Sequence, residues 1–343
     1  MRETAKQDFL RRAGWENAAI APLAGDASNR RYDRLRRSNG EWAVLMDAPP
    51  ERGEALAPFL AIGARLNDLG FSAPRTIAAD LTEGFAVIED LGDDLYARAC
   101  AADPQRETPL YAAAVDLLAA LASTPPRPSF HWDGVEFLTS PYDAKVLLRE
   151  AALAVDWWAP LAADAWSDDA SAEFGDLVAT AVEPVSEARG ALVLRDYHAE
   201  NLLWLPEREG HARVGLLDYQ DALIGHPAYD LVSLLEDARR DTGDALRAAM
   251  IDRFVSAAAI ADPEAFLRDY AILGAQRNLK IIGIFARLRA RDGKDAYLDL
   301  LPRVWAHLRR DLAHPHLSDL RRFVERWLPE PTPEAIARVR ARN

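Results

Sequence analysis

The sequence has 343 residues, of which 50% are hydrophobic and 28% charged, and its formal net charge is −13. The length allows two lobes with ample core, and the acidic balance argues against a general nucleic-acid binder, which needs clustered Lys and Arg. The single cysteine, Cys100, excludes an internal disulfide and a cysteine-rich zinc site, and the longest apolar runs are shorter than a membrane span.

The first ninety residues predict a small antiparallel sheet interrupted by one helix. Turn-forming residues at Gly25-Asp26 and Ser38-Asn39-Gly40 separate the first three strands, as in hairpins. The expected elements are a helix over 4–13, strands over 20–23, 31–36 and 42–47, a helix over 54–69, and strands over 75–79 and 85–89.

The rest of the chain predicts mainly helices. They are expected over 110–122, 141–158, 174–187, 228–240, 244–258, 263–291, 294–310 and 316–327, with a loose tail from 329 and a last helix near 333–340. A short strand over 192–194 and a hairpin partner over 214–217 interrupt them. The pattern predicts an α+β fold with an N-terminal lobe over 1–91 and a helical C-terminal lobe over 92–343.

Three polar residues near this short strand suggest phosphoryl transfer. Asp196 follows the strand, Asn201 comes five residues later, and Asp218 follows the apolar Leu216-Leu217. In a kinase, one carboxylate orients the substrate hydroxyl, while an amide oxygen and a second carboxylate hold magnesium on the nucleotide phosphates. Asp and Asn are also common in turns, so the spacing alone is a weak signal. With the strand order before it, the set predicts an ATP- and Mg²⁺-dependent kinase with Asp196 as the catalytic residue and Asn201 and Asp218 as metal ligands.

The segment from Leu194 to Asn201 resembles the catalytic loop of the protein-kinase-like superfamily, in the version used by small-molecule kinases. That motif commonly reads His-Gly-Asp-x-His-x-x-Asn, and here Leu194 and Arg195 replace the first His and the Gly. The resemblance implies a bilobal kinase-like fold. Arg195 is expected to order a neighbouring segment. Asp230, in a segment that resembles the family's Gly-x-Pro-x-x-Asp-Leu, is expected to brace the loop by satisfying backbone donors.

The turn between the first two strands is the expected phosphate loop. Small residues there let backbone amides approach the phosphates, although one glycine is few for such a loop. The expected ATP-binding residues of this segment are Gly25, Ala27, Ser28, Asn29, Arg30 and Arg31. Glu89 and Leu91, after the fifth strand, are expected to bind adenine through their backbone.

Strand three carries Met46 where a kinase lysine would grip the α- and β-phosphates. Two explanations are open. The protein could be a pseudokinase that binds nucleotide without turnover, or a cation from strand two, Arg30 or Arg31, could replace the lysine. The intact Asp196, Asn201 and Asp218 favour the second explanation.

Several segments together are similar to one branch of the aminoglycoside phosphotransferase superfamily, the bacterial anomeric N-acetylmuramate/N-acetylglucosamine kinases. The resemblance runs from about Gly25 to Arg303 and implies phosphorylation of the sugar C1 hydroxyl for cell-wall recycling; Met at the strand-three position is usual in that family. The segments that carry it are Gly25-Asp26-Ala27-Ser28, Met46-Asp47-Ala48-Pro49-Pro50, Glu89-Asp90-Leu91-Gly92, Leu147-Leu148-Arg149-Glu150, Leu194 to Leu202 and Gln276-Arg277-Asn278-Leu279-Lys280.

The sugar site is expected to combine cations with hydrogen-bonding groups. Arg277 and Asn278 could bind the lactyl carboxylate of N-acetylmuramate, because a guanidinium pairs with a carboxylate in a bidentate fork. Basic residues on helices more often face solvent or pair with nearby acids. The candidates for contacts with sugar hydroxyls are Asp26, Tyr197, His198 and Glu200.

Two other functions remain open at this point. An aminoglycoside or other aminoalcohol kinase would need clustered acids, and a non-catalytic nucleotide-binding module would bind magnesium–ATP without turnover. The acids available for a cationic substrate are Asp237, Asp241, Asp244, Asp292 and Asp295. Protein kinase activity lacks support, because only six residues separate Asp218 from Gly225. In each case we expect a cytoplasmic monomer with no nucleic-acid or membrane partner.

Overall fold

The computed structural model describes residues 2–23 and 29–342, which form two compact units. Unit 1 comprises Met1–Leu117, Arg127–Thr139 and Glu200–Ala222, and unit 2 comprises Leu118–Pro126, Ser140–Ala199 and Leu223–Asn343. Segments well beyond residue 91 therefore pack with the N-terminal sheet. The expected lobe boundary between residues 91 and 92 stays a prediction.

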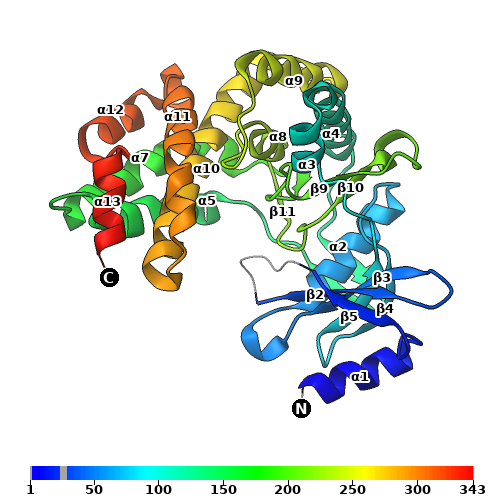
Figure 1. Ribbon diagram of the computed structural model, residues 1–343. Coiled ribbons are helices and arrows are strands. Elements are labelled where there is room, and N and C mark those ends of the chain that lie inside the picture. The colour runs from blue at the N-terminus through cyan, green and yellow to red at the C-terminus, as the bar shows by residue number, and fades with distance from the viewer. Residues whose placement is uncertain (1, 24–28, 343) are drawn as a thin grey trace. The chain divides into compact units, whose positions relative to one another are not determined.

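Unit 1 is built on a five-stranded antiparallel sheet in the order β1-β2-β3-β5-β4 (Figure 1). Its strands are β1 (Ala19–Pro22), β2 (Arg31–Arg36), β3 (Trp42–Asp47), β4 (Thr76–Asp80) and β5 (Phe85–Glu89). The register of β2 and β3 places Tyr32 opposite Met46 and Arg31 opposite Asp47. Because side chains alternate along a strand, each of these pairs shares one face of the sheet.

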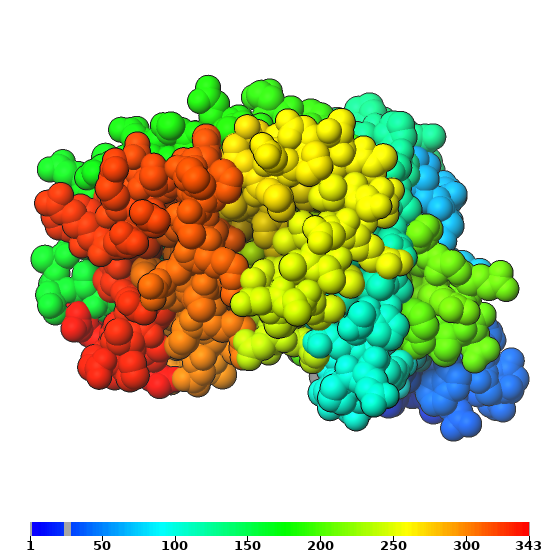
Figure 2. Space-filling view, turned by 90° about the horizontal axis from the view of Figure 1, so that it is seen from above, coloured from blue at the N-terminus to red at the C-terminus, as the bar shows by residue number. Residues whose placement is uncertain are grey.

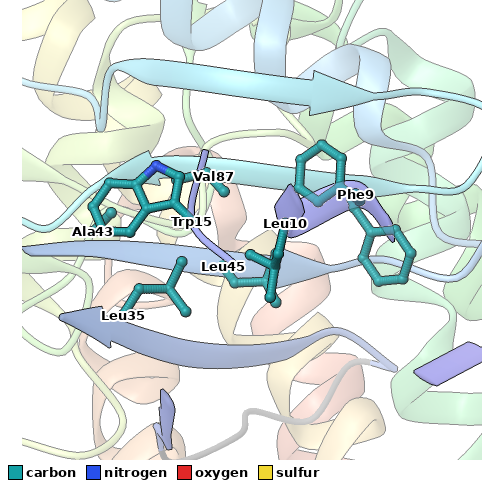
Figure 3. Packing of buried hydrophobic residues seen from close by; sticks show 8 residues of the cluster. Phe9, Leu10, Trp15, Leu35, Ala43, Leu45 and Val87 are labelled. Carbon is teal, nitrogen blue, oxygen red and sulfur yellow. The ribbon is translucent and has the colours of Figure 1, made fainter. Parts of the chain in front are cut away.

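An apolar cluster joins one face of this sheet to α1 (Arg2–Arg12). Phe9 and Leu10 of α1 and Trp15 pack against alternate strand residues such as Ala43 and Leu45, as Figure 3 shows. The rings of Phe9 and Phe85 stack with centroids 5.6 Å apart. Helix α2 (Leu56–Asp68) is drawn on the other side of the sheet in Figure 1.

The remaining elements of unit 1 come from later in the chain. They are the 3₁₀ turns η1 (Pro50–Arg52), η2 (Pro104–Arg106) and η4 (Gly210–Arg213), the helices α3 (Tyr96–Ala102) and most of α4 (Glu107–Ala122), and the hairpins β6 (Ser129–Trp132) with β7 (Val135–Leu138) and β9 (Leu202–Trp204) with β10 (Val214–Leu216). Backbone hydrogen bonds tie the second hairpin into the unit, from Leu216 to Ser72 and from Trp204 to Asp94, at 2.9 and 2.8 Å.

Unit 2 is mainly helical and contains one two-stranded sheet. Its elements are α5 (Ala144–Ala151), the π-helix η3 (Ala154–Trp158), α6 (Ala159–Ala162), α7 (Asp168–Ser186), β8 (Ala191–Val193), β11 (Leu223–Gly225), α8 (Ala228–Leu235), α9 (Asp244–Ala257), α10 (Pro263–Asp292), η5 (Asp295–Leu300), α11 (Leu301–Asp311), η6 (Pro315–Leu317), α12 (Ser318–Trp327) and α13 (Pro333–Ala341). Figure 2 shows α9, in yellow, on the surface of this unit.

Helix α10 is the central helix of unit 2. Asp262 caps its first turn by accepting a hydrogen bond from the Ala265 amide at 3.0 Å, and Gly293 ends it in the left-handed conformation. Most of its residues from 269 to 288 are buried, as expected for a helix surrounded by others. At Gly283 an added Cβ would lie 2.1 Å from the Leu153 carbonyl carbon, so only glycine allows this close approach to the residue before η3.

The predicted partner of the strand before the catalytic loop is wrong. That strand, β8, pairs with β11, through Val193 and Leu223, and not with the strand near 214–217. The latter, β10, pairs instead with β9, which begins directly after Asn201. The three residues of β9 are too short a segment to predict a strand, so the true neighbour of β10 was not predicted.

Several predicted helices differ in extent. The helix expected over 174–187 begins earlier, at Asp168, because Ser167 caps it. The helix expected over 141–158 begins only at Ala144, because Asp143 caps it, and its second half is the π-helix η3 beside Gly283. The helix expected over 228–240 ends at Leu235, where the buried Glu236 leaves helical geometry. The helix expected over 294–310 is a 3₁₀ segment followed by α11. No helix within residues 2–23 and 29–342 is long and apolar enough to span a bilayer.

Candidate active site

The expected catalytic loop follows β8 and is held by a buried carboxylate from α8. Both oxygens of Asp230 accept backbone hydrogen bonds, from Leu194 at 2.6 Å and from Arg195 at 2.7 Å. Burial raises the pKa of Asp230 to about 7, although these two amides favour its charged form. Asp230 thus fixes the direction in which the chain enters the loop.

Arg195 adopts a left-handed backbone conformation, with φ of 73°, which is uncommon for a residue other than glycine. This is the position where the small-molecule kinase motif carries Gly. The side chain of Arg195 is anchored by the buried carboxylate of Glu150, which also accepts a hydrogen bond from Tyr142. These contacts offset the conformational strain that a glycine would avoid.

Lys280 of α10 completes the buried charge network around Glu150. Its ammonium lies 3.2 Å from Glu150 Oε2 and 3.3 Å from the Tyr229 hydroxyl. Burial would raise the pKa of Glu150, but the charges of Lys280 and Arg195 outweigh it and hold that pKa below its ordinary value. Glu150 is therefore an anion that orients two cations beside the loop.

Asp196 lies among several of these cations. Burial would raise its pKa, but Lys280, followed by His198, Arg195 and Arg277, holds the pKa of Asp196 below its ordinary value. Asp196 is therefore ionised at neutral pH and can accept a hydrogen bond from a hydroxyl group.

The other loop residues differ in exposure. Tyr197 and His198 are buried, and Glu200 is exposed. Burial lowers the pKa of His198 below its ordinary value, although the neighbouring Asp237 opposes this effect. His198 is consequently neutral at pH 7, which suits a hydrogen-bonding role better than charge pairing.

The two expected metal ligands lie next to each other in unit 1. Asn201 Nδ2 is 3.4 Å from Asp218 Oδ2, and Gln220 donates a hydrogen bond to the other carboxylate oxygen at 2.6 Å. Asp218 has φ of 57°, and the Leu217 amide donates to the Asn201 carbonyl at 3.0 Å. Carboxylate and amide oxygens are the ligands that Mg²⁺ prefers, so this pair fits that ion.

The residue after Asp218 is packed tightly against α2. The ring of Tyr219 stacks on Phe59 with centroids 5.0 Å apart, and its hydroxyl lies 2.5 Å from where a Cβ on Gly63 would stand. Glycine is needed at residue 63 because any side chain would displace this ring. Neither contact was predicted, since nothing local in the sequence links α2 to residue 219.

The expected ATP-binding residues are only partly described. Gly25, Asp26, Ala27 and Ser28 lie outside the described residues. The amide of Asn29 donates to Glu54 at 3.0 Å, and Arg30 forms an ion pair with the same carboxylate, whereas Arg31 is exposed. No motif in the sequence indicated a role for Glu54.

The segment that was expected to bind adenine carries its own side-chain contacts. The carboxylate of Glu89 pairs with Arg208 at 2.6 Å and with Arg75 at 3.1 Å. Leu91 is half-buried, and its Cδ1 lies 3.3 Å from where a Cβ on Gly215 would stand. A contact of either residue with adenine would use the backbone, as the sequence analysis expects.

The two α10 residues expected at the sugar site have different surroundings. Arg277 Nη2 donates to Ser233 Oγ at 2.8 Å, and Ser233 donates to the Arg195 carbonyl at 3.1 Å. Arg277 Nη1 is buried and has no hydrogen-bond partner among the described residues. Asn278 is fully buried, and its amide donates to Glu236 and Asp311 at 2.8 and 3.0 Å. Of the two, Arg277 is the better candidate for a ligand contact.

A family model described as the phosphotransferase enzyme family matches residues 19–267, more than half of the chain. The chain belongs to this family. The phosphotransferase is 40% identical to the N-acetylmuramate/N-acetylglucosamine kinase of Caulobacter vibrioides, over 96% of this chain and 98% of that protein. It is 33% identical to the kinase of the same name from Pseudomonas aeruginosa, over 90% and 89% of the two chains. The resemblance found in the sequence is confirmed.

A solved structure agrees at the level of the fold. The choline kinase of Streptococcus pneumoniae superposes with a TM-score of 0.59 at 11% identity, over 89% of this chain and 99% of that one. The phosphotransferase therefore has the protein-kinase-like fold that the sequence predicted.

Proposed function

We propose that this protein is an ATP-dependent kinase that phosphorylates the C1 hydroxyl of N-acetylmuramate and N-acetylglucosamine. The observation that carries this proposal is the 40% identity, over 96% of the chain, to a protein named N-acetylmuramate/N-acetylglucosamine kinase. The ionised Asp196, on a loop braced by Asp230, supports it chemically.

Asp196 is the proposed acceptor for the substrate hydroxyl. The sugar oxygen forms a bond to the γ-phosphorus, the bond from that phosphorus to the β–γ bridging oxygen breaks, and ADP leaves. Asp196 aligns the hydroxyl and accepts its proton as the new bond forms. Phosphoryl transfer has a loose transition state, so this alignment matters more than strong basicity.

Asn201 and Asp218 are the proposed ligands of Mg²⁺. Their side chains already lie together, and Gln220 and the left-handed backbone at Asp218 orient the carboxylate. The bound ion supplies positive charge to the β- and γ-phosphates. Adenine is proposed to bind the backbone at Glu89 and Leu91, and the phosphates the loop from Gly25 to Asn29.

Arg277 is the proposed contact for the lactyl carboxylate of N-acetylmuramate. Its Nη2 is fixed by Ser233, and its Nη1 has no hydrogen-bond partner among the residues that the structure describes. Tyr197, His198, Glu200 and Asp26 stay proposed contacts for neutral sugar groups. Asn278 is not retained, because Glu236 and Asp311 occupy its amide.

A cationic aminoglycoside is a less suitable substrate. Of the five acids that could attract it, Asp237 is buried and the other four form ion pairs with arginines of unit 2. These pairs are Asp241 with Arg303, Asp244 with Arg247, Asp292 with Arg291 and Asp295 with Arg289. Acids that already have a cationic partner attract a second cation weakly. We propose that the kinase acts in the cytoplasm, as a monomer, in cell-wall recycling.

A steady-state assay with magnesium–ATP tests the proposal. N-acetylmuramate, N-acetylglucosamine and kanamycin are compared with the wild type and with Asp196→Asn, which cannot accept the hydroxyl proton. Turnover of both acetylated sugars, and its loss by at least about 100-fold in the variant, is expected. Turnover of kanamycin alone, or of no compound, would refute the proposed substrate.

A further inference from the structure

The two faces of the N-terminal sheet differ in what they contact. Ala43 and Leu45 of β3 belong to the cluster under α1 (Figure 3), so the alternating Val44 and Met46 lie on the opposite face. Met46 is fully buried there and occupies the position of the kinase lysine. A cation that replaces the lysine must therefore act from the face opposite α1.

The two candidate arginines differ in their contacts: Arg31 is the first residue of β2, and Arg30 precedes the strand. Arg31 is paired with Asp47, and Arg2 of α1 donates to Asp47 at 3.0 Å. Lys6 of α1 likewise contacts Asp33 at 2.6 Å. Arg31 therefore belongs to the face of α1 and cannot replace the lysine.

The contacts of Arg30 differ from those of Arg31. Tyr32, two residues later, is paired with Met46 and so shares the face opposite α1. Arg30 Nε lies 3.0 Å from Glu54 Oε2, and the side chains of Arg30 and Glu54 are only 9% and 14% exposed. Through its other oxygen, Glu54 also accepts the amide of Asn29 at 3.0 Å. One carboxylate therefore contacts both the guanidinium of Arg30 and the amide at the end of the expected phosphate loop.

We propose that Arg30 contacts the phosphates of ATP in place of the strand-three lysine, and that Glu54 is its positioning residue. The proposal rests on the proposed kinase function. In kinases a glutamate holds the lysine that binds the α- and β-phosphates. Here the glutamate lies two residues before α2 and the arginine lies directly before β2. The glutamate–cation pair is therefore kept, although its two partners come from other positions in the chain. A guanidinium also suits this role, because its planar fork matches phosphate oxygens.

Calorimetric binding of adenosine, ADP and a non-hydrolysable ATP analogue, with Mg²⁺, tests Arg30 without turnover. Arg30→Met should bind ADP and the analogue about 10- to 100-fold more weakly than the wild type, while adenosine binding stays unchanged, because only the phosphate contact is lost. Arg36→Met, at an exposed arginine of β2, is the matched control and should bind all three ligands like the wild type.

Two outcomes would overturn the assignment. If Arg30→Met weakened the binding of adenosine and of ADP equally, the ion pair would only stabilise the fold. If Arg31→Met weakened the binding of ADP and Arg30→Met did not, the phosphate contact would belong to Arg31. Arg30→Lys keeps the positive charge, so its affinity for ADP should fall less than that of Arg30→Met. It replaces Arg30→Met in the test if the latter does not fold.

Glu54 is tested by steady-state kinetics. Glu54→Gln should raise the KM for ATP about 5- to 10-fold and leave the KM for the sugar unchanged, because a neutral amide holds the guanidinium less firmly. An unchanged KM for ATP would contradict the positioning role. If the wild type turned over no sugar, the proposed function would fail, whereas the nucleotide-binding result for Arg30 would still stand.

Discussion

Lys280 and Glu150 form a buried ion pair, with 3.2 Å between Nζ and Oε2, beside the catalytic loop. The same carboxylate anchors Arg195, whose neighbour is Asp196. Of the charges around Asp196, that of Lys280 contributes most to keeping its pKa low. A residue 84 positions from Asp196 in the sequence therefore helps to set its ionisation.

Lys280→Met should raise the pKa of Asp196, because it removes a positive charge that favours the carboxylate. The acidic limb of the profile of kcat against pH should then move to higher pH, while the plateau near pH 8 falls less than about 10-fold. The profile is measured between pH 4 and 8 over the range where the protein stays folded. Lys145→Met, at an exposed position of α5, should leave it unchanged. A shift to lower pH would contradict the proposed electrostatics.

Arg277→Met should reduce kcat/KM for N-acetylmuramate about 10- to 100-fold more than for N-acetylglucosamine, which has no carboxylate. The ratio of the two values measures the carboxylate contact and cancels general damage to the site. Arg149→Met, at an exposed arginine of α5, is the control. Equal losses for both sugars would mean that Arg277 acts only through Ser233 and the catalytic loop.

Gly63→Ala should lower kcat by about 10-fold or more and destabilise the protein by about 1–3 kcal/mol. The new methyl group would overlap the Tyr219 hydroxyl and displace the residue next to Asp218. Gly175→Ala is the matched control, because Gly175 lies within α7 and has no atom within 4 Å of the added Cβ. The free energy of unfolding of that variant should increase by about 0.5–1 kcal/mol. Both effects are measured by urea denaturation and initial rates, and a fully active Gly63→Ala enzyme would refute the role of this packing.

Asp311 should make stability depend on pH. Burial and the neighbouring Glu236 raise the pKa of Asp311 well above its ordinary value, so the folded state holds a proton that the unfolded state releases above about pH 4. Stability from this group is therefore present at low pH and is lost as pH rises. Asp311→Asn cannot ionise, so its free energy of unfolding should rise relative to the wild type between pH 5 and 8. If the difference in the free energy of unfolding between variant and wild type stayed constant between pH 5 and 8, Asp311 would not be the group that holds the proton.

Local sequence predicted much of the fold. The ends of β2, β3 and β5 agree with the predicted strands, because turn residues bound short apolar segments that alternate between two faces. The partner of β8 was wrong because strand pairing depends on residues far apart in the chain. The hairpin of β6 and β7 and the helix α3 were not predicted, since their short segments lie between stronger helical patterns.

In the candidate site, too, residues close together in the sequence were predicted, whereas contacts between distant segments were not. Asp196, Asn201 and Asp218 stood out because they lie within one short motif. Glu150 appeared only as part of the resemblance, and its ion pairs with Arg195 and Lys280 depend on three separate elements. The choice between Arg30 and Arg31 needed the register of β2 with β3, which no single segment contains.

The position of the transferred phosphate tests the central claim most directly. The protein is incubated with magnesium–ATP and N-acetylglucosamine, and the product is analysed by ³¹P and ¹³C NMR. We predict a phosphate on C1, seen as phosphorus coupling at the anomeric carbon, with none formed by Asp196→Asn. A phosphate on C6, or equal product from that variant, would contradict the account.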